Sequence, residues 1–196
     1  MSATIRFLRW APLLRSAVYG IQRARCAEII GRFESSLGGG PILDVGAGTC
    51  NGTELLLERG LEVTPLDVVD ISFIPSIQPV LYDGITMPFD DDTFELALIL
   101  TVLHHAKDPD AVLREARRVA KRVIVVEDVI RGPVHGFFTA AWDSLMNLEF
   151  IGHPHNNRTD ASWLESFEAA GLRLEHREDL WSFLIMWQVT YMLERA

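Results

Sequence analysis

Short runs of apolar residues alternate along the chain with longer segments whose apolar residues recur every three or four positions. The short runs predict buried β-strands and the longer segments predict helices packed by one face. Such an alternation favours an α/β fold, with helices covering a mainly parallel sheet. The predicted helices are 13–36, 51–59, the segment after Asp108, 135–149 and the segment after Thr159 or Asp160. The predicted strands are 42–45, 61–67, 79–82, 96–100, 123–126 and two more in 172–193.

Individual residues sharpen several of these boundaries. Leu96–Leu100 is apolar at every position, which is typical of a central strand covered on both faces. Asp108 followed by Pro109 predicts a helix N-cap with proline in the first turn. Gly171 is placed to end the last predicted helix. Pro65 is unusual within a strand because it cannot donate to the hydrogen-bond ladder.

The N-terminal helix, 13–36, carries an apolar stripe that leads into the body of the protein. Leu14, Val18 and Ile21 start the stripe, and residues 29–33 continue it towards the core. We expect residues 1–32 to form a lid over the functional cleft and not a cleaved signal. Deletion of residues 1–20 is then expected to weaken turnover and to leave the sheet folded.

Composition and cysteine content limit the class of protein. The chain has 196 residues, of which 48% are hydrophobic and 23% charged, as in one globular domain with a sizeable core. Its longest apolar run, Leu96–Leu103, is too short to span a bilayer. The two cysteines, Cys26 and Cys50, cannot form a disulfide framework. We therefore expect a single domain in a reducing, cytoplasmic setting.

Charge is distributed unevenly. The formal net charge of −9 argues against a nucleic-acid partner, which requires a basic surface. Residues 1–32 nevertheless carry six arginines against the single acid Glu28. This segment is interpretable as a targeting peptide or as a contact with an anionic membrane. We favour a first helix with solvated arginines, because the chain from Arg23 to Phe33 continues into the domain without a cleavage-like break.

The strongest chemical signal is a strand followed by a glycine turn, Ile42–Gly48, which contains Asp44. Glycines let the backbone approach a ligand closely, and the start of the next helix offers free N–H groups. The second predicted strand ends at Asp67, 21 residues after Gly46, a spacing suited to a ribose. These features predict a nucleoside-containing cofactor at the carboxyl ends of parallel strands.

The same turn argues against a dinucleotide. A G-x-G-x-x-G fingerprint requires glycine at position 51, where this chain has Asn51. Asp44 would also repel a pyrophosphate, whereas it suits a cation. The ammonium and sulfonium groups of a methionine-derived cofactor fit that charge.

Four segments together resemble the class I S-adenosylmethionine-dependent methyltransferases, in particular the small-molecule, type 11-like group. They are Asp44–Thr49, Met87–Leu96 with Pro88-Phe89-Asp90, Val102–His105 with Asp108-Pro109, and Leu113–Val119. The resemblance covers about residues 42–128. It implies a single Rossmann-like, doubly wound sheet of seven strands, in the order 3-2-1-4-5-7-6, with an antiparallel last strand. Cys50 departs from the usual glycine, and the short span from Asp67 to Asp83 implies a rudimentary third helix.

The resemblance also implies cofactor contacts. Gly46, Ala47 and Gly48 would line the methionine portion through their backbone, with Asp44 near its ammonium group. Asp67 would accept from both ribose hydroxyls. These assignments are carried over by motif and by position in the chain.

The remaining implied contacts lie on the adenine and methionine sides. Val68 would lie against the adenine ring, and Asp83 would accept from its amino group, with Gly84 and Ile85 beside it. The alternative interpretation of Asp83 is an ordinary turn residue before Gly84. Thr101, at the end of the fourth strand, would close the methionine side.

Two further groups of residues have both a functional and a structural interpretation. His104 and His105 follow the fourth strand, so one of them is a candidate general base or acceptor contact, or a structural imidazole. His153-Pro154-His155 has a spacing that suits a metal, but no second ligand cluster accompanies it in the sequence, so we expect no metal site. The aromatic residues Phe137, Phe138, Trp142, Trp181 and Trp187 are candidates for an acceptor pocket or for ordinary core.

We therefore expect methyl transfer from S-adenosylmethionine to a small-molecule acceptor, with S-adenosylhomocysteine as product. The expected arrangement is a helical lid (1–36), a cofactor-binding half (40–130) and substrate-side helices with the final strands (131–196). The alternatives are a non-catalytic S-adenosylmethionine-binding module and a dinucleotide-dependent oxidoreductase.

Overall fold

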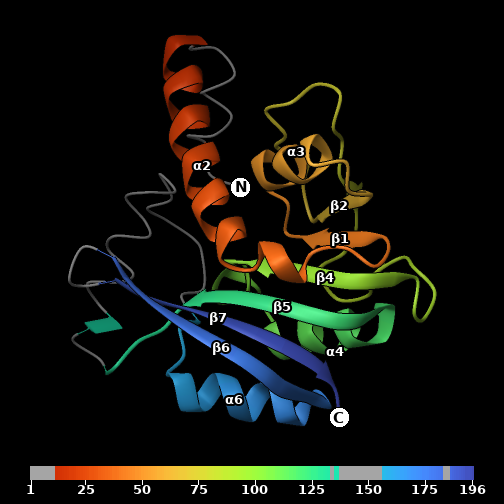
Figure 1. The fold of residues 1–196 in the computed structure, drawn as a ribbon, viewed down its shortest axis with the longest axis vertical. Coiled ribbons are helices and arrows are strands. Elements are labelled where there is room, and N and C mark those ends of the chain that lie inside the picture. The colour runs from red at the N-terminus through yellow and green to blue at the C-terminus, as the bar shows by residue number, and fades with distance from the viewer. Residues whose placement is uncertain (1–11, 133–134, 137–155, 183–185) are drawn as a thin grey trace.

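A seven-stranded sheet forms the centre of the molecule, in the order β3-β2-β1-β4-β5-β7-β6. The computed structural model describes residues 12–132, 135–136, 156–182 and 186–196 (Figure 1). The strands are β1 (Ile42–Val45), β2 (Val63–Asp67), β3 (Val80–Leu81), β4 (Phe94–Leu100), β5 (Ala120–Asp128), β6 (Leu172–Ser182) and β7 (Met186–Arg195). The described helices are α2 (Pro12–Arg32), α3 (Asn51–Glu58), α4 (Pro109–Val119) and α6 (Asp160–Ala169), with 3-10 turns η1 (Glu34–Ser36) and η2 (Leu103–His105).

The strand directions confirm the predicted topology. β1 pairs in parallel with β2 and β4, β2 with β3, and β4 with β5. β7 is antiparallel to both β5 and β6. The carboxyl ends of β1, β2, β4 and β5 therefore meet at one edge of the sheet, where open α/β sheets bind their ligands.

The capping residues explain where two helices begin. The Asp108 side chain accepts a hydrogen bond from the Ala111 amide at 2.9 Å, and Pro109 follows in the first turn of α4. For α6 the cap is Thr159 and not Asp160, because the Thr159 hydroxyl accepts from the Ser162 amide. Both are N-caps of the usual kind.

The sheet has a core on each face. Adjacent residues of β4 point into opposite cores. Ala97 packs in one core and Leu98 in the other, and both are fully buried. One core packs β4 against Ile30 of α2 and Leu56 of α3, and the other packs it against α4 and Trp163 of α6 (Figure 1). This two-sided burial confirms β4 as a central strand.

One sequence prediction departs from the structure between β2 and β3, whereas the predicted strand that contains Pro65 is confirmed. No helix forms in residues 68–79, so the third helix is absent and not merely rudimentary. Pro65 lies inside β2, opposite Asp44 of β1. It is tolerated because β3 pairs only with Leu66 and Asp67, which leaves Pro65 beyond that ladder.

The N-terminal helix α2 differs from the sequence predictions in two respects. Ile21 is 58% exposed, so the predicted apolar stripe does not bury it; the stripe reaches the core only from Ile29 onwards. The side chain of Leu14 lies outside the described residues. In addition, the arginines of α2 are not simply solvated, because all four, Arg15, Arg23, Arg25 and Arg32, contact the body of the protein.

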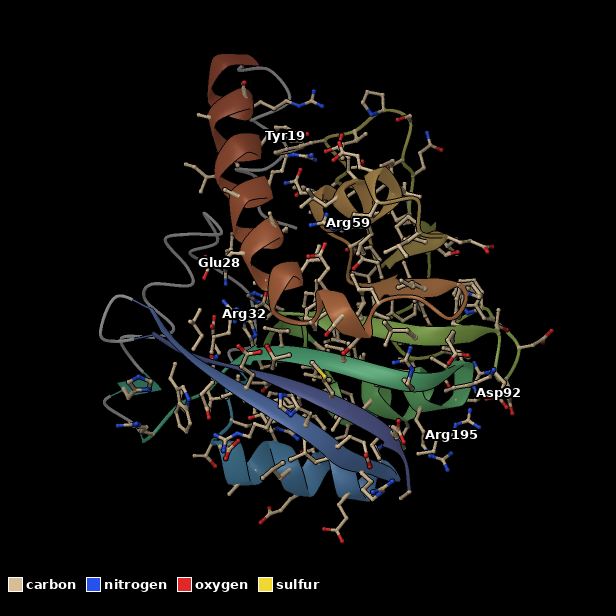
Figure 2. The ribbon with its side chains drawn as sticks, viewed as in Figure 1. Tyr19, Glu28, Arg32, Arg59, Asp92 and Arg195 are labelled. Carbon is tan, nitrogen blue, oxygen red and sulfur yellow. The ribbon has the colours of Figure 1, made fainter. Side chains whose placement is uncertain are left out.

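These pairs attach α2 along its length. Arg23 pairs with Glu54 of α3 at 2.5 Å, and Arg25 approaches Asp128 of β5 at 3.7 Å. Arg32, labelled at the C-terminal end of α2 in Figure 2, donates to the Gln188 side chain of β7 at 2.8 Å. Polar contacts therefore hold the helix over α3 and over the ends of β5 and β7.

Some expectations concern residues outside the described part of the chain. These are residues 137–149 of the predicted helix at 135–149, the His153-Pro154-His155 triplet, and Phe137, Phe138 and Trp142 among the aromatic residues. None of the helices that the structure describes combines the length and apolarity that a membrane span requires.

Candidate cofactor-binding cleft

The turn after β1 depends on two glycines. Gly46 and Gly48 have φ angles of +70° and +56°, in the left-handed region that other residues rarely adopt. A Cβ atom built on Gly46 would lie 2.6 Å from both γ carbons of Val102. The segment that follows β4 (residues 101–104, the post-β4 segment) therefore packs directly on this turn. Its Val102 side chain occupies the space that a larger residue at position 46 would need.

Asp44 is buried beside this turn, with 5% of its surface exposed. Its Oδ2 accepts a hydrogen bond from the Thr53 hydroxyl at 2.6 Å. Among the residues that the structure describes, Asp44 has no ion-pair partner. Burial raises the pKa of the Asp44 carboxyl to about 6, although the Thr53 hydrogen bond lowers it. A cation placed here would offset that cost.

Asp67, at the end of β2, is also buried and is tied to the glycine turn. Its Oδ2 accepts from the Gly48 amide at 2.8 Å, and its Oδ1 accepts from the Val69 amide at 3.2 Å. Burial raises the pKa of Asp67, and these backbone hydrogen bonds oppose the rise. The ends of β1 and β2 are thereby joined through one carboxylate.

Two exposed aliphatic side chains follow the ends of β2 and β3. Val68 is 57% exposed and Ile85 is 63% exposed, beside Gly84, whose φ is +82°. A Cβ atom on Gly84 would lie 3.2 Å from a γ carbon of Val68. Apolar side chains held open at a sheet edge suit the flat face of an aromatic ring.

Asp83 shapes the turn that carries Ile85. Its Oδ1 accepts from the amides of Ile85 and Thr86, both at 2.8 Å, and these hydrogen bonds lower the pKa of the Asp83 carboxyl. The interpretation of Asp83 as a turn residue is therefore confirmed. Its predicted contact with an adenine amino group stays a prediction.

The residues after β4 differ from one another in exposure. Thr101 has a left-handed φ of +57°, and its amide donates to the Val126 carbonyl at 2.7 Å. His104 is fully buried, with Nδ1 2.5 Å from Glu127 Oε2, whereas His105 is half-buried. The two imidazole rings lie 4.0 Å apart between centroids.

Sequence reasoning missed two groups that the structure adds to this edge. Glu127 ends the apolar run of β5 and is fully buried; an acid directly after four apolar residues was the available signal. Gln22 of α2 accepts hydrogen bonds from the Thr49 hydroxyl at 2.9 Å and from the Asn51 amide nitrogen at 3.2 Å. The N-terminal helix is therefore bound directly to the glycine turn.

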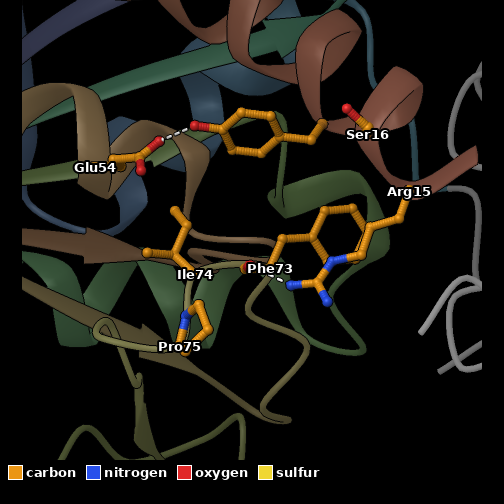
Figure 3. A pocket seen from close by; sticks show the side chains of 7 residues that line it. Arg15, Ser16, Glu54, Phe73, Ile74 and Pro75 are labelled. Carbon is orange, nitrogen blue, oxygen red and sulfur yellow. Dashed lines mark hydrogen bonds between the residues drawn. The ribbon is translucent and has the colours of Figure 1, made fainter. Parts of the chain in front are cut away.

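A hollow of about 410 Å³ lies beside this attachment, between α2 and the segment after β2 (Figure 3). The Tyr19 hydroxyl donates to Glu54 of α3 on one side, and Arg15 donates to the Phe73 carbonyl on the other. The residues that line it are Arg15, Ser16, Tyr19, Glu54, Phe73, Ile74 and Pro75. The lining of the hollow therefore includes none of the predicted site residues.

The sheet order, the antiparallel seventh strand and the acid-flanked glycine turn define the Rossmann-like fold of class I methyltransferases. Residues 43–123 match the sequence model of the family described as "Methyltransferase domain". This sequence similarity covers the part of the chain that runs from β1 into β5.

A named relative has a similar sequence over part of its length. A demethylmenaquinone methyltransferase of Streptomyces griseus is 33% identical over 95 residues, which cover 44% of this chain and 41% of the relative. The chain therefore aligns with less than half the length of that relative.

Solved structures share the fold at low sequence identity. The magnesium protoporphyrin IX methyltransferase of Synechocystis, with bound S-adenosylhomocysteine, superposes with a TM-score of 0.64 at 14% identity, over 89% of this chain and 84% of its own. The [4+2]-cyclase SpnF superposes with a TM-score of 0.67 at 17% identity, over 87% and 80%. Because one neighbour is named as a cyclase, the fold alone does not fix the reaction.

Proposed function

We propose that this protein transfers a methyl group from S-adenosylmethionine to a small-molecule acceptor. The observation that carries the proposal is the buried Asp44 carboxylate beside the glycine turn, which in the described structure has a hydroxyl partner and no cation. The ammonium group of the cofactor's methionine portion supplies that cation. A pyrophosphate would place negative charge against the same carboxylate, so a dinucleotide is disfavoured.

Other residues at this edge of the sheet contact the remaining parts of the cofactor in this proposal. Asp67 accepts the ribose hydroxyls, and its hydrogen bond from Gly48 sets its distance from the turn. Val68 and Ile85 hold the adenine ring between exposed aliphatic side chains, and Asp83 faces its amino group. Thr101 and the turn from Gly46 to Gly48 enclose the methionine end.

The reaction requires the protein mainly to align the acceptor with the methyl group. S-adenosylmethionine, when bound, supplies a methyl group already activated by the sulfonium. The chain positions the acceptor in line with that methyl group and excludes water. Where the acceptor must lose a proton, His105 is the better placed of the two histidines to contact it, because His104 is fully buried.

The acceptor is proposed to be a small molecule on three grounds. The net charge of −9 opposes a nucleic-acid substrate. The named relatives of similar sequence or fold include enzymes whose names specify small molecules, a demethylmenaquinone and a magnesium protoporphyrin. The acceptor is expected over the carboxyl edge of the sheet, between α2 and the segments that follow β4 and β5.

Ligand binding tests the cofactor assignment. S-adenosylhomocysteine should raise the melting temperature of the protein, because a ligand that binds only the folded state stabilises it by mass action. NADH and NADPH at the same concentration are the controls and should leave it unchanged. Stabilisation by NADH or NADPH alone would contradict the proposal and favour an oxidoreductase.

Methyl transfer is tested separately. Isotope-labelled S-adenosylmethionine should pass its methyl group to at least one member of a small-molecule acceptor library that includes quinols and phenols. Tight S-adenosylhomocysteine binding without transfer to any acceptor would favour a non-catalytic binding module.

A further inference from the structure

One buried carboxylate holds three consecutive residues after β4. Glu127 is fully buried at the carboxyl end of β5. Its Oε1 accepts from the amides of Val102 at 3.0 Å and Leu103 at 2.6 Å. Its Oε2 lies 2.5 Å from Nδ1 of His104. The side chain of one strand thus fixes the path of the chain that leaves its neighbour.

That path determines how closely the post-β4 segment approaches the glycine turn. The Val102 γ carbons would lie 2.6 Å from a Cβ atom on Gly46, so the two backbones are in close contact. Thr101, immediately before, is held in a left-handed conformation, which is unfavourable for a β-branched residue. A strained backbone persists only where its surroundings over-determine it, and the hydrogen bonds of Glu127 supply part of that constraint.

The fold by itself gives no reason for an acid here. Glu127 follows Val125 and Val126 in a strand buried on both faces, where an apolar residue packs at lower cost than a carboxylate. The amides of Val102 and Leu103 and the Nδ1 atom of His104 offset this cost, and all three groups belong to residues 102–104. The contacts of the carboxylate are therefore directed at one target, the segment that follows β4.

We propose that Glu127 is a positioning residue for the cofactor site, which acts through Val102 and His104. It holds residues 101–104 against Gly46 and so sets how closely they approach the glycine turn at the proposed methionine end of the site. A carboxylate only accepts hydrogen bonds, so it also selects the form of His104 that carries a proton on Nδ1. The inference rests on the proposed function, since it takes this cleft to be the S-adenosylmethionine site.

The neighbouring residue provides a matched control. Asp128 is 2% exposed and carries the same charge, but its carboxylate accepts from Gln188 at 3.0 Å and approaches Arg25 at 3.7 Å. In the described structure it makes no hydrogen bond to residues 101–104. Asp128→Asn therefore removes a buried charge from the same strand end without releasing the post-β4 segment.

Affinity for S-adenosylhomocysteine, measured by titration calorimetry, tests the positioning role without knowledge of the acceptor. Glu127→Ala and the shorter Glu127→Asp should each weaken binding by about ten-fold or more. Glu127→Gln should stay within about three-fold of wild type, because its amide oxygen still accepts from Val102 and Leu103. Asp128→Asn should also stay within about three-fold.

The Glu127→Gln variant should also change the NMR signals of the His104 imidazole. The Glu127→Gln amide nitrogen can donate to Nδ1 of His104, so the proton of the imidazole should move from Nδ1 to Nε2. Nitrogen-15 NMR of labelled histidine reports this change in the ligand-free protein. A His104 that has its proton on Nε2 in wild type would contradict the tautomer assignment.

The outcomes separate the two proposals. If wild type binds S-adenosylhomocysteine and folded Glu127→Asp binds it within about three-fold of wild type, the positioning role is overturned and the proposed function stands. If wild type does not bind it at all, the proposed function fails and the positioning role fails with it. Glu127→Asp keeps the charge, so the test does not depend on the folding of Glu127→Ala.

Discussion

Asp44 is a residue at which stability and function conflict. Its carboxylate is buried, and the pKa is raised from 3.8 to about 6 chiefly by that burial. A group whose pKa is higher in the folded than in the unfolded protein favours folding at low pH. That contribution is complete below about pH 4 and is lost as the pH rises through about 6.

Asp44→Asn is therefore expected to stabilise the ligand-free protein at neutral pH. Two pKa units correspond to about 3 kcal/mol in the free energy of unfolding, and the variant should gain a large part of this at pH 7. At pH 4 the two proteins should be nearly equal. Urea denaturation at both pH values measures the difference. A variant that is less stable than wild type at pH 7 would contradict the argument.

The same substitution should weaken the cofactor site. Asparagine can still accept from Thr53, but it does not attract an ammonium group. We expect S-adenosylhomocysteine to bind Asp44→Asn at least about ten-fold more weakly at pH 7. In wild type, affinity should fall as the pH drops below about 6, where Asp44 takes up a proton. An unchanged affinity from pH 5 to 7 would exclude Asp44 as the ammonium ligand.

Asp67→Ala tests the predicted ribose contact. Charge-assisted hydrogen bonds contribute roughly 1.5–3 kcal/mol each, and water recovers part of their loss. We expect S-adenosylhomocysteine to bind about 2–4 kcal/mol more weakly, on the order of 30- to 1000-fold. Some stability is also expected to be lost, because Asp67 accepts from the amides of Gly48 and Val69.

The control for Asp67 is Asp70→Ala, in the same segment. Asp70 is exposed and accepts only a local hydrogen bond from the Ser72 amide. Calorimetry should find its affinity for S-adenosylhomocysteine close to that of wild type. An Asp67→Ala affinity within about three-fold of wild type would show that this acid is not the ribose ligand.

At the scale of the element, α4 depends on its first turn. Asp108 accepts from the Ala111 amide, and the helix buries Val112, Leu113 and Ala116 against the sheet. Asp108→Ala should lower the free energy of unfolding by about 1 kcal/mol, as is usual for loss of an N-cap. Asp108→Ser, which keeps a capping oxygen, should recover most of it. Equal stability of the two variants in urea denaturation would contradict the capping role.

The helix α2 shows a different kind of attachment. Its C-terminal end is fixed by apolar burial of Ile29 and Ile30, whereas its middle is fixed by polar pairs such as Arg23 with Glu54. Partly exposed ion pairs are individually weak and are screened by salt. The middle of α2 is therefore the part of this helix that can move without disruption of the core.

At the scale of the whole molecule, this arrangement predicts the effect of truncation. Deletion of residues 1–20 removes the bond from Tyr19 to Glu54 but keeps Ile29, Ile30 and Phe33 in the core. The sheet should remain folded, as circular dichroism can report, while turnover of the acceptor falls. The matched control, Tyr19→Phe in the full chain, loses only the hydroxyl contact and should be affected less. Unchanged kinetics in the truncated protein would exclude a lid role.

The candidate site is assembled only at this scale. Asp44, Asp67 and Glu127 lie on three different strands, and Thr101 directly follows a fourth. Parallel pairing of β2, β1, β4 and β5 in that order brings their carboxyl ends to one edge. A methionine-derived cofactor with a nucleoside fits an edge that has acids at its polar positions and aliphatic residues beside Gly84.

The sequence by itself determined the strands, the helix caps and the glycine turn, because these depend on local chemistry. An apolar run at 96–100 has to be buried on both faces, Asp108 before Pro109 caps a helix, and Gly46 accepts a backbone that other residues avoid. The family resemblance then supplied the strand order, which periodicity does not contain.

Only the tertiary structure decided which side chains pair across the sheet edge. In the structure the Glu127 carboxylate accepts hydrogen bonds from the amides of Val102 and Leu103. His104 is buried, whereas His105 is only half-buried. The arginines of α2, which the sequence predicted to be solvated, pair with other elements. Each of these contacts joins residues more than 20 positions apart. Partner choice at such separations depends on the packing of whole elements, for which local pattern carries no information.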